Sequence, residues 1–313
     1  MKTKSMNKVM TILFLITLST VILSGIANAA TIEVKQLGCS SLPDCYTKIN
    51  DAIFYAQQDD TIKVYPGRYE EAVVINKNLT LIGSGPEVTT IYSSLDGITI
   101  NQYISATIIG FTIRASQDGI FADDISETII RNNVVVSNGD DGIYINCAKS
   151  TIINNVIANN MDKGIETNSC SNNFPDNVTV TNNIVFNNKY GLYLGSEAEY
   201  ILYNNVYSNV PGGNYYGCSA GTGDISQNPL FIDSSNGNYV LQSTSPSKNA
   251  GTPGSADADP DGTRNDMGAY GGPDAAGFWP YPPGAPIITN LTVTPTTVQK
   301  GETITINATG EIR

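Results

Sequence analysis

A glycine followed by a short apolar stretch returns five times along this chain at nearly constant spacing. The copies are Gly97-Ile98-Thr99-Ile100, Gly119-Ile120-Phe121, Gly142-Ile143-Tyr144-Ile145, Gly164-Ile165-Glu166 and Gly191-Leu192-Tyr193-Leu194, and Gly213 extends the series. Successive glycines lie 22, 23, 22, 27 and 22 residues apart. A short repeat rich in β-branched and aromatic residues is typical of a solenoid in which each repeat forms one coil of strands. The spacing therefore predicts stacked β coils.

Paired asparagines form a second series that keeps step with the glycines. The pairs are Asn132-Asn133, Asn154-Asn155, Asn182-Asn183 and Asn204-Asn205, and both series absorb one insertion near 170–176. Asparagine tolerates the left-handed backbone of a tight turn better than most residues. We therefore expect a structural ladder of stacked amides, hydrogen-bonded from coil to coil, made of Asn133, Asn155, Asn183 and Asn205. Phe111 occupies the equivalent position one coil earlier, where the ladder should end.

The first 29 residues have the pattern of a secretory signal peptide. Three lysines precede an apolar run from Val9 to Ile26, and Ala27-Asn28-Ala29 forms an A-x-A cleavage site. We expect a secreted or cell-surface protein with no membrane span after cleavage. Because the peptide carries three lysines and no acid, its removal shifts the net charge from −12 to −15. This acidity argues against nucleic acid or an anionic membrane as a partner.

The chain contains no histidine. Histidine is the commonest general base and the usual ligand of zinc and copper, so we expect neither metal, nor a Ser-His-Asp triad. A bound nucleotide is not expected either.

Five cysteines in an exported chain can form disulfides. Cys39 and Cys45 flank a short loop and are expected to pair. Cys147 and Cys170 follow successive repeat glycines, so they either form a bridge between coils or remain buried thiols. Cys218 is then left over.

Apolar residues at helical spacing, Ile49, Ala52, Ile53 and Ala56, predict a helix that caps the open first coil. The segments that follow resemble the start of the pectin-lyase-like family of right-handed parallel β-helices. The resemblance is carried by Asp51-Ala52-Ile53, Asp60-Thr61-Ile62-Lys63-Val64, Pro66-Gly67-Arg68-Tyr69 and Leu79-Thr80-Leu81-Ile82-Gly83, and continues to about Gly272. It implies an all-β fold, a right-handed parallel β-helix of about 22-residue coils with an N-terminal capping helix. The family contains lyases, hydrolases, epimerases and non-catalytic surface proteins, so it implies no single activity.

The chain divides into four parts. After the signal peptide, residues 30–280 are expected to form the β-helix with its caps, and the stretch from 217 resembles a C-terminal finishing coil. A proline-rich linker spans 281–286. The segments Ile287–Thr294 and Glu302–Ala308 alternate like two strands of an immunoglobulin-type sandwich, so 287–313 is interpreted as an incomplete domain of that kind.

Strand alternation predicts which side chains of the repeat face solvent. Ile98, Ile120, Ile143, Ile165 and Leu192 should point into the core, and the next residue of each copy, Thr99, Phe121, Tyr144, Glu166 or Tyr193, should point outward. The resemblance places a polysaccharide groove on this face. Aromatic rings suit the apolar faces of sugars, and amides suit their hydroxyl groups. The expected glycan contacts are Phe121, Tyr144, Asn146, Asn168, Tyr190 and Tyr193.

Two chemistries fit the charged residues of the same face. In the first, Asp118, Asp123 and Asp141 bind Ca²⁺, and Lys163 with a lowered pKa removes a proton from a bound uronate, as in polysaccharide lyases. In the second, two carboxylates among Asp140, Asp141 and Glu166 hydrolyse a glycosidic bond. Gly139-Asp140-Asp141-Gly142 resembles a segment of polygalacturonases, but the Gly-His-Gly and Arg-Ile-Lys segments of that family are absent. If the protein is an enzyme, its predicted catalytic residues are Lys163, Asp141 and Glu166, and a lyase is favoured over a hydrolase.

A second calcium hypothesis concerns Asp257, Asp259 and Asp261. Three carboxylates at alternate positions before a glycine are typical of an oxygen-ligand loop, although Gly268 stands where an EF-hand requires Glu. Calcium is therefore the one cofactor that the sequence suggests.

The leading interpretation is a secreted or cell-surface β-helix protein that binds a polysaccharide or another cell-envelope glycan. The alternatives are a calcium-dependent lyase acting on a uronate polymer, and a structural spacer in an adhesin or envelope protein.

Overall fold

The computed structural model describes residues 29–39, 45–123, 127–147, 149–168, 178–195 and 200–280 in full, and the backbone of 286–294 and 305–312. The expected signal peptide, apart from Ala29, lies outside the described residues, and so do the insertion at 170–176 and Cys170. No helix within the described ranges is long and apolar enough to cross a membrane.

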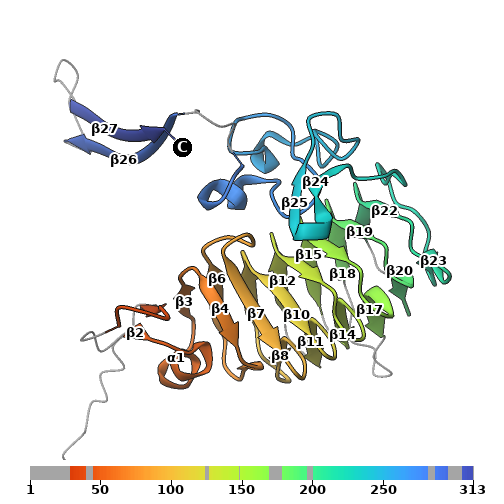
Figure 1. Cartoon of the computed structure of the whole chain (residues 1–313), viewed down its shortest axis with the longest axis horizontal. Helices are drawn as coiled ribbons and strands as arrows, with labels where there is room; N and C mark the ends of the chain where they lie inside the picture. The colour runs from red at the N-terminus through yellow and green to blue at the C-terminus, as the bar shows by residue number, and fades with distance from the viewer. Residues whose placement is uncertain are drawn as a thin grey trace, which may run out of the picture.

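Three parallel β-sheets, stacked coil by coil, form the body of the molecule (Figure 1). Sheet A has nine strands: β2 (Cys45–Tyr46), β1 (Thr31–Val34), β3 (Asp60–Val64), β6 (Leu79–Gly83), β9 (Ala106–Ile109), β12 (Thr128–Arg131), β15 (Ser150–Ile153), β18 (Val178–Thr181) and β21 (Tyr200–Leu202). Sheet B has seven: β4 (Gly67–Glu70), β7 (Thr89–Ser93), β10 (Thr112–Ala115), β13 (Val134–Val136), β16 (Val156–Ala158), β19 (Ile184–Phe186) and β22 (Asn205–Tyr207). Sheet C also has seven: β5 (Val73–Ile75), β8 (Ile98–Ile100), β11 (Ile120–Asp123), β14 (Ile143–Asn146), β17 (Lys163–Asn168), β20 (Tyr190–Leu194) and β23 (Gly213–Tyr216).

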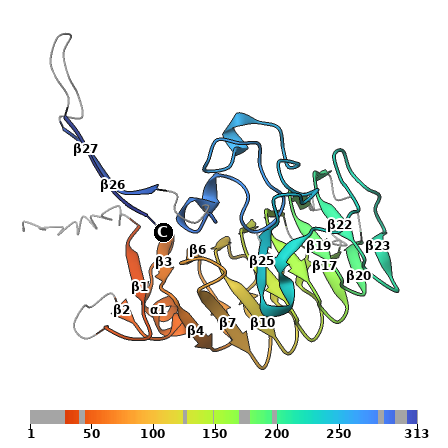
Figure 2. The same cartoon turned by 45° about the horizontal axis from the view of Figure 1, so that its top comes forward.

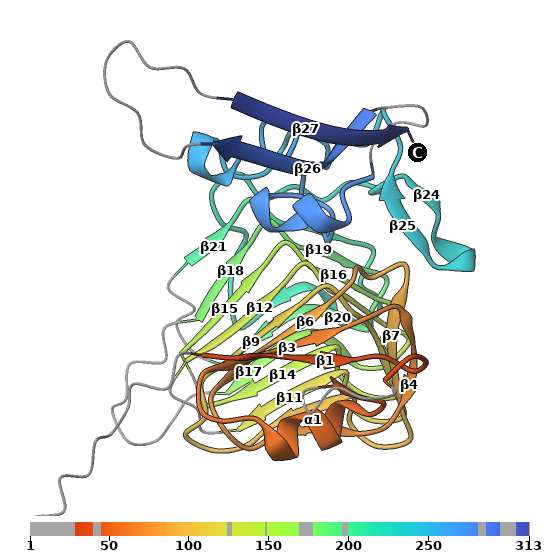
Figure 3. The ribbon, with the colours of Figure 1, turned by 90° about the vertical axis from the view of Figure 1, so that its left-hand side faces the viewer.

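The predicted repeat sets the register of sheet C. Ile98 pairs with Ile120 and Ile120 with Ile143, so identical positions of the repeat lie one above another. Ile143 is fully buried whereas Tyr144 is only half-buried, which confirms the predicted alternation. Viewed along the axis, the three sheets enclose one core that the inward isoleucines, valines and leucines fill (Figure 3). The expected parallel β-solenoid is therefore confirmed.

Small residues are needed where the coils enter sheet C. A Cβ on Gly142 would lie 2.6 Å from the carbonyl oxygen of Gly164, so a larger residue would push the coils apart.

The last member of the glycine series differs from the prediction. Tyr193 pairs with Tyr216, which places Asn214 rather than Gly213 level with Gly191.

An asparagine ladder joins the coils between sheets A and B, but its last member is Asn204 rather than the predicted Asn205. The side-chain amide of each member donates to the next: Asn133 to Asn155 at 3.2 Å, Asn155 to Asn183 at 3.0 Å, and Asn183 to Asn204 at 3.1 Å. The coil after β18 is one residue shorter, so Asn205 pairs with Ile184 and donates instead to Ser247. As predicted, the ladder ends at buried Phe111, whose backbone N–H donates to Asn133.

The first asparagine of each pair, not the second, adopts the left-handed backbone. Asn132, Asn154 and Asn182 have φ of 54°, 52° and 58°, and Tyr203 takes this position in the shorter coil with φ of 56°. Their side chains point away from the core. The paired asparagines thus divide two tasks, one making the turn and the other the ladder.

Sequence reasoning missed a second ladder, which follows sheet B. Asn138, Asn160, Asn188 and Asn209 are buried, and each side-chain amide donates to the next within 3.0 Å. Their spacing was visible in the sequence, and two of them are the second members of pairs, Asn159-Asn160 and Asn187-Asn188, whereas a serine precedes Asn138 and Asn209. Two ladders therefore satisfy buried turn amides that have no water to bind.

The C-terminal segment folds back over the outer face of sheet B (Figures 1 and 2). It contains the hairpin β24 (Phe231–Asp233) and β25 (Asn238–Leu241), joined by η1 (Ser234–Asn236), and two further short helices, η2 (Ser255–Asp257) and η3 (Pro273–Gly277). A second apolar cluster fills this interface, and its larger members are Val134, Val156, Ile184, Phe231, Tyr239, Met267, Phe278 and Trp279. Single parallel bridges join Thr222 to Leu202 and Ile225 to Asn205, and the resemblance to a finishing coil stays a prediction.

The turn asparagines also hold this segment. The Asn132 amide donates to the carbonyls of Ala269 and Gly271, and the Asn154 amide donates to the side chain of Asn265. Because these turns lie at the border of sheet B, their polar side chains satisfy backbone groups that the returning segment would otherwise bury unpaired.

The N-terminal helix and one disulfide follow the prediction. Helix α1 (Ile49–Tyr55) buries Ile49, Ala52 and Ile53; its role as a cap stays a prediction. Cys39 and Cys45 form a disulfide with Cα atoms 5.5 Å apart. Cys147 is disulfide-bonded rather than a free thiol, and Cys218 is free.

The last two strands pair antiparallel. They are β26 (Pro286–Thr294) and β27 (Thr305–Ile312), and the expected start of the second strand at Glu302 lies outside the described residues. The immunoglobulin-like assignment stays a prediction.

The covered face of sheet B yields a first prediction. Val156 and Tyr144 both point away from the solenoid core, but Val156 is fully buried under the C-terminal segment. We expect Val156→Asp to lower the melting temperature by roughly 10 °C or more, because a buried unpaired carboxylate costs several kcal/mol. Tyr144→Asp should cost much less. Equal melting temperatures of the two variants, measured by circular dichroism, would show that sheet B is not covered in solution.

Candidate functional site

The outer face of sheet C carries one continuous stripe of side chains. Strand pairing aligns Thr99, Phe121, Tyr144, Glu166, Tyr193 and Tyr216 across successive coils. The first five were predicted. Tyr216 was missed because the outward residue of each copy stands two after its glycine. Counting from Gly213 gives Tyr215, which packs against the core instead.

Aromatic rings of the stripe form two groups. Phe121 and Tyr144 have ring centroids 5.3 Å apart. Tyr193 and Tyr216 are stacked, with centroids 4.4 Å apart and planes 7° apart, and Tyr190 meets both rings edge-on. We call Tyr190, Tyr193 and Tyr216 the tyrosine platform. It presents rings at the end of the solenoid where Tyr216 is half exposed.

A charged cluster lies between the two aromatic groups. The Lys163 ammonium is 3.0 Å from a Glu166 oxygen, 2.9 Å from an Asp162 oxygen and 3.5 Å from an Asp141 oxygen. It also lies 5.3 Å from the centroid of the Tyr193 ring. The structure thus brings together all three predicted catalytic residues, Lys163, Asp141 and Glu166, within one half-buried network.

The surroundings of Lys163 oppose the pKa that a general base requires. Burial by itself lowers the pKa of this ammonium, but the hydrogen bonds to Asp162 and Glu166 and the charge of Asp141 outweigh it, so the pKa lies above its usual range. Lys163 therefore remains protonated at neutral pH, contrary to the lowered pKa that we expected.

Two carboxyl groups of the cluster, the buried Asp141 and the partly buried Asp118, bind protons more tightly than a free aspartate. Burial and the hydrogen bond with Glu166 raise the pKa of Asp141 to about 8. Burial raises the pKa of Asp118 to about 6, although the backbone N–H of Asp141 favours its charged form.

These aspartates also form a ladder along the coil axis. The backbone N–H of Asp118 donates to Asp96, that of Asp141 donates to Asp118, and that of Lys163 donates to Asp141. Each carboxylate therefore receives a backbone N–H from the equivalent residue of the next coil, which gives it a structural role whatever else it binds.

Of the expected calcium ligands, the structure brings Asp118 and Asp141 together but not Asp123. Among the described residues, carboxylate oxygens of Asp118, Asp140 and Asp141 lie within 4.8 Å of one another. Asp123 stands at the opposite end of strand β11 and accepts from Asn146 at 2.6 Å instead. Asn168 similarly donates to the hydroxyl of Tyr144 at 2.8 Å. The two predicted amides therefore flank the stripe on the edge away from the charged cluster.

The carboxylates of the 257–261 loop do not converge. Asp259 is buried, and its oxygens accept from the backbone N–H groups of Asp266 and Gly272. Asp261 instead accepts from Thr263. Asp259 and Asp261 therefore each accept hydrogen bonds from their own part of the chain, and burial raises the pKa of Asp259 to about 7.

The sequence is similar to one curated protein over part of its length. A cell surface glycoprotein of Methanothermus fervidus is 34% identical over 125 residues, which are 39% of this chain and 20% of the relative. The chain therefore aligns with only a fifth of that relative.

Two enzymes are among the solved structures that superimpose on part of this chain. Pectate lyase Pel9A superimposes with a TM-score of 0.38 at 15% identity, covering 79% of this chain and 97% of the lyase. Pectin methylesterase PemA from Erwinia chrysanthemi superimposes with a TM-score of 0.31 at 13% identity, covering 57% of this chain and 70% of the esterase.

The family model described as "Right handed beta helix region" matches residues 38–207. This match spans more than half of the 313 residues and includes most strands of the three sheets. The chain belongs to the right-handed β-helix family.

Proposed function

We propose that this protein is an exported, cell-surface β-helix protein that binds neutral extracellular carbohydrate along the outer face of sheet C. The observation that carries the proposal is the tyrosine platform. Stacked, half-exposed rings offer flat apolar surfaces for sugar rings, and the charged cluster beside them offers hydrogen-bond partners for hydroxyl groups. The surface location is supported by the name of the partial relative.

The charge of this face favours a neutral sugar over a uronate. Even without Asp141, which is protonated at neutral pH, Asp118, Asp140, Asp162 and Glu166 gather on or beside the stripe, against the two lysines Lys163 and Lys189. A carboxylated sugar would meet like charges here. The protonated state of Lys163 also argues against the lyase hypothesis, because a general base must accept a proton.

Glycan binding is tested by removing rings from the platform. We expect Tyr193→Ala and Tyr216→Ala each to weaken binding to a neutral polysaccharide about fivefold, the equivalent of about 1 kcal/mol for one stacking contact. Affinity electrophoresis through gels containing single polysaccharides measures the change. Tyr200→Ala, which removes an exposed ring from sheet A, serves as the matched control. If no polysaccharide retards the wild type, the spacer function is favoured instead.

Calcium is the second part of the proposal. Three carboxylates within 4.8 Å suit a hard cation that prefers oxygen ligands. We expect millimolar calcium to raise the melting temperature, because the ion binds only the folded state. Asp140→Asn should abolish the increase, whereas Asp261→Asn should preserve it. Retention of the full calcium effect in Asp140→Asn would exclude this cluster.

The raised pKa values of Asp118 and Asp141 predict a pH dependence of stability. Unfolded aspartates titrate near pH 4, roughly, so between that pH and about 8 the folded state holds more protons than the unfolded state. Stability must then fall as pH rises through this window. With a chelator present, we expect a higher melting temperature at pH 5 than at pH 8, and a smaller difference in Asp141→Asn. An unchanged difference in that variant would contradict the protonation of Asp141.

A further inference from the structure

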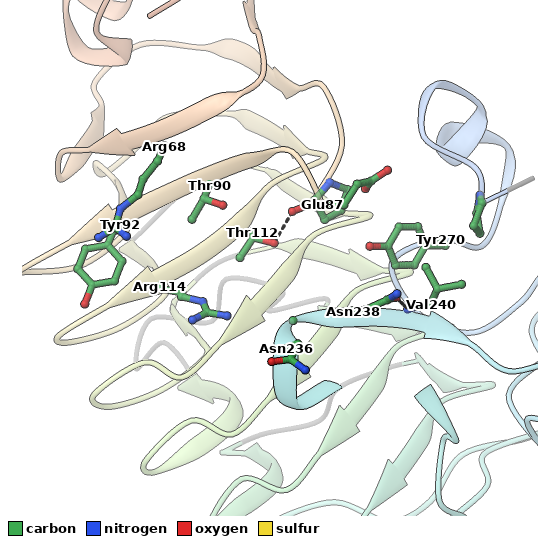
Figure 4. Close-up of a pocket in the computed structure, with 13 residues that line it drawn as sticks. Arg68, Glu87, Thr90, Tyr92, Thr112, Arg114, Asn236, Asn238, Val240 and Tyr270 are labelled. Atoms are coloured by element: carbon green, nitrogen blue, oxygen red, sulfur yellow. Dashed lines mark hydrogen bonds between the residues drawn. The ribbon is translucent and has the colours of Figure 1, made fainter. Parts of the chain in front are cut away.

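A cavity of about 550 Å³ lies on the outer face of sheet B, away from the sheet C stripe (Figure 4). Its floor consists of outward side chains of β4, β7 and β10, which strand pairing arranges in two rows. Arg68, Thr90 and Thr112 form one row, and Tyr92 and Arg114 belong to the other. The tip of the β24–β25 hairpin and Tyr270 form its walls.

The cavity is preformed because its walls are anchored. Phe231 and Tyr239 of the hairpin lie in the apolar cluster over sheet B. The tip turns through Gly237, whose φ of 85° is left-handed. A Cβ at this glycine would lie 3.7 Å from a guanidinium nitrogen of Arg114, so the turn and the guanidinium are neighbours. Little reorganisation is needed before a ligand binds.

Arg114 is a cation without a carboxylate partner among the described residues. Arg68, by contrast, pairs with Glu70 at 3.0 Å and lies 4.4 Å from the centroid of the Tyr92 ring. Figure 4 shows Arg114 and Tyr92 on one side of the cavity and Glu87 on the other, beside Tyr270. In a chain of net charge −12, this side of the cavity thus presents uncompensated positive charge.

We propose that this cavity binds an acidic saccharide, with the sugar carboxylate on Arg114 and the sugar ring against Tyr92. A guanidinium matches a carboxylate with two parallel hydrogen bonds. Tyr92 is 45% exposed and offers an apolar ring surface beside that cation. The hydroxyl oxygens of Thr90 and Thr112 line the floor and can accept from sugar hydroxyls. The volume exceeds what a free phosphate fills and suits one or two sugar rings.

This site is independent of the function proposed for sheet C, and it prefers a charged sugar where sheet C prefers a neutral one. The acidic stripe favours neutral sugars, whereas the arginine-lined cavity selects for a carboxylate. A glycan that contains both neutral and uronate units could therefore contact two faces of one solenoid, which would increase the overall affinity.

Titration calorimetry with D-glucuronate, D-glucose and inorganic phosphate tests the assignment on the folded chain. We expect glucuronate to bind more tightly than either other probe. Arg114→Gln should weaken glucuronate binding about tenfold, because a charged hydrogen-bonded contact is lost. Tyr92→Ala should weaken glucuronate binding while leaving phosphate unchanged.

Two variants on other faces serve as controls. Lys149→Gln removes one positive charge from an exposed pair on sheet A, and Tyr193→Ala removes a ring of the tyrosine platform. Both should bind glucuronate like the wild type, and all variants should keep the wild-type melting temperature. The proposal is overturned if Arg114→Gln binds glucuronate normally, if phosphate binds as tightly as glucuronate, or if Tyr193→Ala abolishes glucuronate binding. The last outcome would place the uronate on sheet C and would also contradict the neutral-sugar proposal.

Discussion

The coil-to-coil hydrogen bonds of buried asparagine amides are the constraint on which the rest of this structure depends. At the turns beside sheet B, the amide of Asn155 is typical: it donates to the side chain of Asn183 in the next coil and to the backbone carbonyls of Ile130 in the preceding coil and Ile153 in its own turn. A shift of one coil by a single residue would leave these groups buried and unpaired, at a cost of about 1–3 kcal/mol each. The ladders therefore lock the register, and the register aligns every outward stripe.

The outer faces of sheets B and C differ although both belong to one periodic scaffold. Valines at outward positions of sheet B require a cover, which the returning C-terminal segment supplies through Phe231, Tyr239 and Trp279. On sheet C the outward positions carry rings and charges, and they remain partly open. The cover ends before the first strands of sheet B, and the arginine-lined cavity lies at this border.

Much of the fold could be predicted because a periodic sequence repeats the same physical problem in each coil. Ile143 inside and Tyr144 outside follow directly from alternation. The error at Asn205 shows the limit of such reasoning. The pair Asn204-Asn205 repeats the earlier pairs in sequence, but strand pairing places Tyr203 at the left-handed position and Asn204 in the ladder. A recurring residue pair therefore cannot reveal that one coil is a residue shorter than the others.

Some features of the candidate site also followed from the repeat, whereas others required the structure. The sequence by itself determined the coil period, the buried positions and the approach of Lys163 to Asp141, since residues at equal places in neighbouring repeats must lie side by side. Glu166 joins them because it lies on the same strand as Lys163. Only the tertiary structure decided the protonated state of Lys163, the separation of Asp123 from the other acids and the cavity beside Arg114. The physical reason is that burial, charge partners and a non-periodic segment folding back on the coils have no counterpart in the repeat.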